Sequence, residues 1–217
     1  MDFSFSEEQE DLRREARAFL EANPSPTTAQ LEEVGWVGIL GGDEFGFLDA
    51  AVLFEELGRV NYTGSFIRDE VGDDRNRLLA ALALEAVGIG AKATELAVAY
   101  VSDREQFGKK IGTYQAVSHA IVDAYVAVEL ARSLAYWAAW AVAEDDEQAD
   151  LACAAAKSQA AEAAVRACET SIQAHGGIGF TWEHVLHRYY KRALELEGAL
   201  GYGRVHRAEI AASLLRS

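Results

Sequence analysis

The sequence predicts an all-α protein built around a bundle of long helices. Alanine-rich stretches with apolar residues at helical spacing fill most of the 217-residue chain. The only prolines are Pro24 and Pro26, so the rest of the chain lacks this helix breaker. Successive alternating runs joined by hairpin turns, which would indicate a β-domain, do not occur. Half of the residues, 50%, are apolar, enough to bury a sizeable core.

An N-terminal helical segment is expected over residues 1–66. Ser6 and Gln9 are spaced as a capping box that opens a helix. Leu12, Ala16, Phe19 and Leu20 then recur at helical spacing, and the two prolines end the run. Two further helices are expected at 28–34 and 49–57, with a glycine-rich loop at 35–46 between them and Gly58 as the stop of the third helix.

A C-terminal bundle is expected over residues 77–217, after a junction at 67–76. The stretch 59–76 has no clear period and is rich in glycine and aspartate. Alanine-rich faces beyond it allow close helix packing in an up-down bundle. Thr113 is a plausible N-cap of the second bundle helix. The bundle helices are expected at 77–102, 113–143, 149–174 and from 181 or 182 to about 194, with a last helix at 204–215.

The formal net charge of −15 at pH 7 argues against nucleic-acid binding, in which positive charge carries most of the affinity. It also argues against docking on an anionic membrane. The longest apolar run, 134–143, is too short to span a bilayer, and the acidic N-terminus, with Asp2 and Glu7, is no signal peptide. Cys153 and Cys168 form no C-x-x-C pair, so we expect small buried residues of a reducing, cytoplasmic compartment.

The turn between the first two bundle helices is dense in ligand-recognising side chains. It reads R-E-Q-F-G-K-K-I-G-T-Y-Q-A over 104–116. Arg104, Phe107 and the neighbouring amides suit a pyrophosphate with an attached base, because arginine binds phosphate through a planar fork. The alternative is an ordinary solvated turn. A second turn, Q-A-H-G-G-I-G-F-T at 173–181, ends the third bundle helix, and its glycines either terminate that helix or let a phosphate come close.

Together these two motifs resemble the acyl-CoA dehydrogenase family, whose patterns are R-x-x-F-G-x-x-I-x-x-x-Q and Q-x-x-G-G-x-G-[FY]. The start of the chain, F-S-F-S-E-E-Q-E-D-L-R-R-E-A-R-A-F-L, is a weaker match. The resemblance covers nearly all of the chain, but a β-barrel domain of about 100 residues, expected at the junction, is absent. It therefore implies that family's C-terminal helical domain with a short N-terminal helical piece.

The resemblance implies a site for the adenine-dinucleotide half of FAD, shared across a dimer interface. Arg104 would lie at the pyrophosphate, and the neighbouring protomer would supply the second turn. Tyr114 stands where many relatives have histidine or phenylalanine. The implied cofactor-binding residues are Arg104, Gln106, Phe107, Ile111, Gln115, Gln173, Gly176 and Gly177.

A catalytic base is not identified. Many family members place a glutamate before a glycine, and the matching position here is Leu200, followed by Gly201. Glu197 precedes Gly198 but lies three residues early, which moves it about 4.5 Å along a helix. Glu195 is also nearby. Other members place the base on the first bundle helix, where the matching residues, Leu78 and Leu79, are apolar and Glu85 is more than a turn away.

A histidine pair and an aromatic group could each bind a ligand or play a structural role. His184 and His187 are spaced at i and i+3, where sharing a metal is possible but an interfacial or capping role is favoured, so no metal site is predicted. Tyr136, Trp137 and Trp140 either stack on a ligand or belong to the core or an interface.

The resemblance implies an FAD-linked subunit for α,β-dehydrogenation of an acyl-CoA thioester, with electrons passed to an electron-transfer flavoprotein. It resembles the subunits of heteromeric members, so the expected assembly is a homo- or hetero-oligomer, with a full-length paralogue as the partner that supplies the base. The alternative is a structural or regulatory subunit that kept the bundle for assembly.

Overall fold

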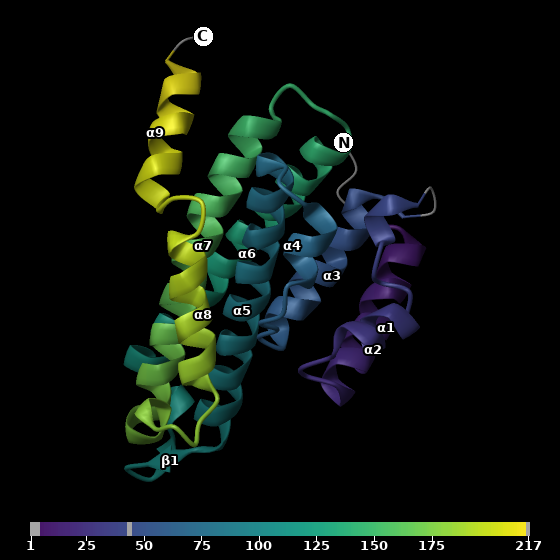
Figure 1. The fold of residues 1–217 in the computed structure, drawn as a ribbon. Helices are drawn as coiled ribbons and strands as arrows, with labels where there is room; N and C mark the ends of the chain where they lie inside the picture. Colours follow the sequence, from purple (N-terminus) through teal and green to yellow (C-terminus); the bar gives the residue numbers. More distant parts are fainter. Residues whose placement is uncertain (1–4, 43–44, 216–217) are drawn as a thin grey trace.

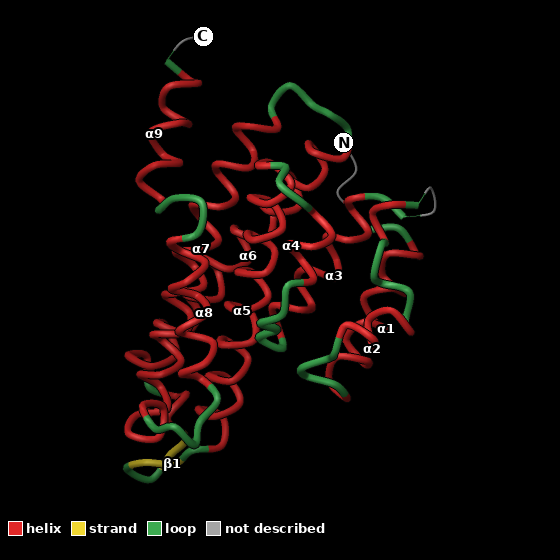
Figure 2. The backbone as a smooth tube through the Cα atoms, viewed as in Figure 1, coloured by secondary structure: helices red, strands yellow, loops and turns green. Residues whose placement is uncertain are grey.

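The computed structural model describes residues 5–42 and 45–215. Three parts of the sequence predictions lie outside the described residues: Asp2, residues 3–4 of the N-terminal match, and residues 43–44 of the glycine-rich loop. Within the described part, the chain is helical apart from loops and one small antiparallel hairpin (Figure 2). The predicted all-α fold is therefore confirmed.

The bundle helices are much longer than those of the N-terminal segment. In chain order the elements are α1 Glu7–Ala22, α2 Thr28–Glu33, η1 Ile39–Gly41, α3 Phe47–Arg59, α4 Phe66–Val71, α5 Arg75–Asp103, β1 Glu105–Gln106, β2 Lys109–Lys110, η2 Ile111–Thr113, α6 Gln115–Ala143, α7 Ala149–His175, η3 Gly176–Phe180, α8 Leu186–Gly198 and α9 Gly203–Leu214.

The helices α5, α6 and α7 pack against one another as the centre of the molecule (Figure 1). Their contact faces are rich in alanine, which lets the backbones approach closely; Ala83, Ala135 and Ala160 are all fully buried. The helix α8 packs on α5 and α7, whereas α3 packs on α5 and α6 from the side of the N-terminal segment. The hairpin β1–β2 projects from one end of the bundle (Figure 1).

Two glycines set the approach of α3 to α5. A Cβ atom at Gly88 would overlap the carbonyl oxygen of Glu55, and one at Gly58 would overlap the carbonyl oxygen of Glu85. The prediction that Gly58 stops the third helix is wrong, because α3 continues to Arg59. Gly58 lies there because only hydrogen fits between the two backbones.

Buried carboxylates of α3 also join the N-terminal helices to the bundle. Glu55 accepts hydrogen bonds from Arg132 Nε at 2.9 Å and from the Tyr136 hydroxyl at 2.8 Å. Glu56 accepts two from Arg17 of α1, at 3.0 and 2.6 Å. A buried carboxylate is tolerated only when it is paired in this way, so these contacts fix how the N-terminal helices sit on the bundle.

The local predictions had mixed outcomes. The capping box is confirmed, since the Ser6 side chain accepts from Gln9 and the Gln9 side chain accepts in return. Thr113 is not the N-cap of α6: that residue is Tyr114, and the Thr113 hydroxyl donates to Lys110. The short elements α4, β1 and β2 were missed, and the fourth bundle helix begins at Leu186 because η3 and a turn precede it.

The aromatic group of α6 belongs to the core of this chain. Tyr136, Trp137 and Trp140 are partly buried and pack on the main core, and so does Tyr190, while Tyr189 is buried within it. The apolar side chains left exposed on α6 are instead Val122, Tyr125, Val126 and Leu130.

Candidate functional site

The first turn predicted to bind a nucleotide is a tight hairpin at the end of the bundle. Its tip, Phe107 and Gly108, has φ angles of 54° and 80°, a left-handed conformation that glycine adopts freely. The Phe107 ring is 94% exposed. An apolar ring held in solvent on a rigid hairpin is a surface for stacking or for contact with another molecule.

The hairpin is held by its own side chains, which leaves one cation free. The Tyr114 hydroxyl donates to the Gln106 carbonyl at 3.2 Å, and the Lys109 ammonium lies 4.1 Å from the Tyr114 ring centroid. Lys110 donates to the Asp103 carbonyl at 2.9 Å. Arg104 is exposed, and among the described residues none forms a hydrogen bond or ion pair with its guanidinium. That group is available to an anion.

The second turn is open where a ligand backbone would approach. Gly176 has φ 63° and ψ −139°, a conformation essentially restricted to glycine. A Cβ at Gly176 or Gly177 would meet no atom within 4 Å, whereas one at Gly179 would lie 2.6 Å from the Ile172 carbonyl oxygen. Gly179 therefore serves packing, and the first two glycines face open space.

The structure brings the two turns to the same end of the bundle. Ile111 and Ala174, one from each motif, pack on the same small apolar cluster of Ala97, Val101 and Ile121. Gln115 and Gln173 are both exposed, and Gln173 lines a groove of about 450 Å³ between α6 and α7. All eight predicted cofactor residues therefore lie on or beside one end of the helical bundle.

Three histidines lie against the second turn. The His175 ring stacks on Tyr100 at 4.3 Å between centroids and lies 4.5 Å from His184. Burial, followed by the charges of His175 and His187, lowers the pKa of His184. The Nδ1 atom of His187 lies 2.7 Å from the His184 carbonyl oxygen, a local contact at the start of α8. Within the described residues, no group of three or more His, Cys, Asp or Glu side chains is placed to hold a metal ion.

Leu200 and Leu78, two positions that the resemblance matches to a catalytic base, line one cavity. They line this space of about 400 Å³ together with Ile67, Leu82 and Leu196; we call it the leucine cavity. Four charged residues also line it: Arg68, Glu85, Arg192 and Glu195. Leu200 has φ 56°, which is unfavourable for a leucine. Its loop is anchored by Lys157, which donates to the Leu196 carbonyl at 2.7 Å, and by His206, which donates to the Gly201 carbonyl at 3.1 Å.

The carboxylates beside this cavity are held by an arginine that the sequence reasoning missed. Glu85 is 1% exposed and accepts from Arg192 Nε at 2.7 Å and Nη2 at 3.1 Å. Arg192 Nη1 donates to Glu195 at 3.2 Å. Burial raises the pKa of Glu85, and Arg192 opposes this. Glu197 is not among the residues lining the cavity. No sequence signal could have joined Glu85 to a partner on α8.

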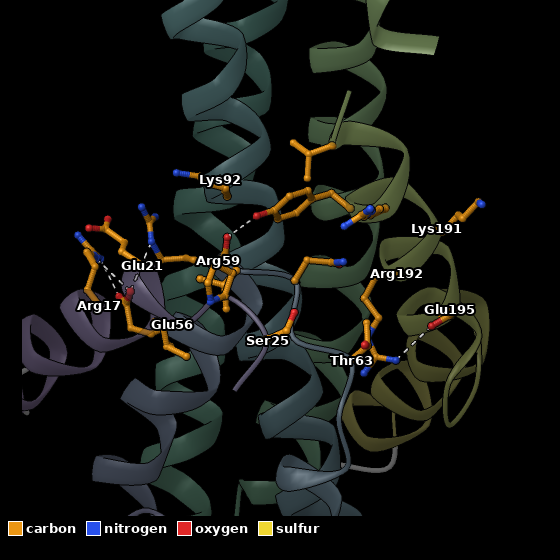
Figure 3. A pocket seen from close by; sticks show the side chains of 17 residues that line it. Arg17, Glu21, Ser25, Glu56, Arg59, Thr63, Lys92, Lys191, Arg192 and Glu195 are labelled. Carbon is orange, nitrogen blue, oxygen red and sulfur yellow. Dashed lines mark hydrogen bonds and ion pairs between the residues drawn. The ribbon is translucent and has the colours of Figure 1, made fainter. Parts of the chain in front are cut away.

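A second space lies between α1, α3, α5 and α8 (Figure 3). It measures about 560 Å³, and we call it the basic cleft. Its lining carries six cationic side chains and only three carboxylates, in a chain whose net charge is −15. The cationic residues are Arg17, Arg59, Lys92, Arg188, Lys191 and Arg192.

A family profile described as "Acyl-CoA dehydrogenase, C-terminal domain" matches residues 75–215. Among curated proteins, the acyl-CoA dehydrogenase FadE34 of Mycobacterium tuberculosis is 44% identical over 135 residues, which are 61% of this chain and 19% of FadE34. The acyl-CoA dehydrogenase IpdE2 of the same organism is 39% identical over 52% of this chain and 33% of its own length. The match thus spans a fifth to a third of these relatives.

Solved structures share the fold. A chain of the ChsE4–ChsE5 complex from Mycobacterium tuberculosis superposes with a TM-score of 0.88 at 18% identity, over 100% of both chains. Butyryl-CoA dehydrogenase from Megasphaera elsdenii superposes with a TM-score of 0.83 at 16% identity, over 99% of this chain and 100% of its own. Of the helices described, none is long and apolar enough to cross a membrane.

Proposed function

This chain belongs to the acyl-CoA dehydrogenase family, and we propose that it is an FAD-linked subunit for α,β-dehydrogenation of a CoA thioester, working with a partner chain that supplies the base. The observation that carries the proposal is the joint presence of the free Arg104 guanidinium and the open Gly176–Gly177 turn at one end of the bundle. Their chemistry suits a pyrophosphate shared between two chains.

The residues present fit the dinucleotide half of FAD and do not enclose it. Arg104 would bind the pyrophosphate through its fork, while Gln106, Phe107, Ile111 and Gln115 would surround the nucleotide. Gln173, Gly176 and Gly177 would approach it from a neighbouring subunit. FAD supplies the acceptor for the hydride that leaves the β-carbon. This chain's own part is to bind and orient; no side chain at its two base positions accepts a proton.

The assembly is proposed to be an oligomer containing a full-length relative. ChsE4–ChsE5 is described as a complex, and a stripe of exposed apolar residues on α6 (Val122, Val126 and Leu130, one turn apart) suits a helix-packing interface. We further propose an electron-transfer flavoprotein as the electron acceptor and the cytoplasm as the location. Cys153 and Cys168 are free and buried, as expected for that compartment.

A second candidate function is a structural or regulatory subunit, which the leucines at both base positions favour. The test is co-expression with full-length acyl-CoA dehydrogenase relatives, purification of any complex, and measurement of its flavin content and of dye reduction by acyl-CoAs. A flavin-containing complex whose activity requires this chain supports the dehydrogenase subunit. If the full-length relative is equally active with and without this chain, the structural role is supported.

A further inference from the structure

The leucine cavity and the basic cleft follow one another along the same two helices. On α5, Leu78, Leu82 and Glu85 line the cavity and Lys92 lines the cleft. Their spacing of four, three and seven residues keeps them on one helix face. On α8 the order runs the other way, from Leu196 in the cavity to Arg188 in the cleft. The lining therefore changes along the groove between α5 and α8, from mainly apolar, with Arg68 as the one cation besides Arg192, to predominantly cationic.

Arg192 and Glu195 line both spaces and mark the boundary between them. Arg192 is fixed by two hydrogen bonds to the buried Glu85, so its guanidinium has a set orientation. Glu195 is 65% exposed at its side chain, and an exposed ion pair is weak. A carboxylate arriving from the leucine cavity can replace Glu195 on Nη1 of Arg192 with little loss.

Beyond Arg192, two cations have no carboxylate partner. Arg188 and Lys191 are exposed residues of α8, and no ion pair in the described part of the chain engages either; the Lys191 ammonium lies 4.3 Å from the Trp182 ring centroid. The remaining cleft cations do have partners: Arg17 and Arg59 bind Glu56, and Lys92 lies 3.7 Å from Glu95. Arg188 and Lys191 thus supply positive charge that forms no ion pair with a carboxylate of the described residues.

We propose that the chain binds acyl thioesters whose acyl group ends in a carboxylate, with the hydrocarbon in the leucine cavity and the distal carboxylate in the basic cleft. This rests on the proposed function, because a thioester whose α-carbon faces the two base positions lies near Leu200 and Leu78. From the level of Leu78 to that of Glu85, α5 rises about 10 Å. A medium-length acyl chain entering at Leu200 and Leu78 therefore brings its far end to Arg192.

The test compares ligands that differ only in the distal group. Suberyl-pantetheine and octanoyl-pantetheine have acyl chains of equal length and lack phosphates, so the distal carboxylate is the only anion. Binding to the full chain is measured by calorimetry. We expect the suberyl thioester to bind about tenfold more tightly, as for a charge-assisted hydrogen bond. The advantage should fall as salt is added.

Matched variants locate the effect. Arg188→Gln with Lys191→Gln should reduce the suberyl advantage, because Arg192 remains to bind the carboxylate, and should leave octanoyl binding unchanged, because neither residue lines the leucine cavity. Glu195→Gln should increase the advantage by removing a competing carboxylate. Arg166→Gln, which removes one exposed positive charge on α7, is the control and should leave the advantage intact.

Three results would overturn the inference. Equal binding of the two pantetheine thioesters would leave the basic cleft without this role while the proposed function stands. Tighter binding of octanoyl-CoA than of octanoyl-pantetheine, lost with Arg188→Gln and Lys191→Gln, would assign the cleft to the phosphates of CoA. Failure of every thioester to bind, both to the chain and to its complex with a full-length relative, would remove the proposed function as well.

Discussion

Lys157 offers a direct test of how the loop at Leu200 is held. It is 1% exposed in alanine-rich α7, and its ammonium donates to the Leu196 carbonyl near the end of α8. Burial lowers the pKa of Lys157 from 10.5 to about 8, and the charge of Glu197 opposes this. We therefore expect this residue to make the stability of the chain depend on pH in the alkaline range.

The direction of this pH dependence follows from the protonation of Lys157 in the folded and the unfolded chain. Because the folded-state pKa lies below the unfolded value, the unfolded chain holds more protons on Lys157 between about pH 8 and 10.5. The contribution of Lys157 to stability therefore rises with pH across this window and is lost as pH falls through 8. At about 1.4 kcal/mol per pKa unit, the full change is on the order of 3 kcal/mol.

The assay is urea unfolding of the wild type and Lys157→Met at several pH values from 7 to 10.5. Other groups titrate in this range in both proteins, so the quantity of interest is the difference between them. That difference should increase with pH in favour of the wild type. Lys109→Met, at an exposed lysine of the hairpin, serves as the control and should show no such trend. Parallel pH profiles for the wild type and Lys157→Met would refute the reasoning.

Four further outcomes are expected. Gly88→Ala should destabilise the chain by about 2 kcal/mol in urea unfolding, because the overlap with α3 outweighs the gain in helix propensity; Gly198→Ala, with nothing closer than 3.4 Å, should be neutral, and equal stability of both variants would contradict the packing argument. Arg104→Ala should lower flavin occupancy of the assembled complex without unfolding the bundle, and unchanged occupancy would exclude Arg104 from the site. The chain alone should be colourless, because its residues do not enclose FAD. It should also be inactive toward acyl-CoAs, because leucines occupy both base positions and a positioned base contributes about 10²–10⁴-fold to the rate; a yellow, active single chain would contradict this. Sedimentation at micromolar concentration should show self-association, and a well-folded monomer would count against an interface on α6.

The sequence was sufficient to predict the long helices but not the short helix α4 or the contacts between helices. Long runs of helical periodicity predicted the bundle. The two turns with ligand-recognising residues were predicted from their local motifs, and both lie at one end of the bundle. Gly58 shows the limit: a glycine that ends a helix and one that admits a neighbouring backbone look the same in a single sequence. The strands β1 and β2 have two residues each, too short to show alternation.

In the candidate site, too, local motifs could be predicted from the sequence and contacts between distant residues could not. Arg104 and Gly176 could be proposed as site residues because their motifs are local, and the leucines at the base positions followed from the resemblance. The pairing of Glu85 with Arg192 joins residues 107 positions apart, and nothing local signals it. The sequence also left the role of the α6 aromatic rings open, because the hydrogen bond of Tyr136 to a buried carboxylate of α3 depends on how α3 packs against α6.

The anchored loop at Leu200 bears on how this chain could change its chemistry. Lys157 and His206 fix the backbone on either side of Leu200, and neither contact involves its side chain. Replacing the leucine by glutamate would therefore put a carboxylate at the edge of a cavity that is already formed, without rebuilding the loop. At this position, a single substitution would introduce a side chain that can accept a proton.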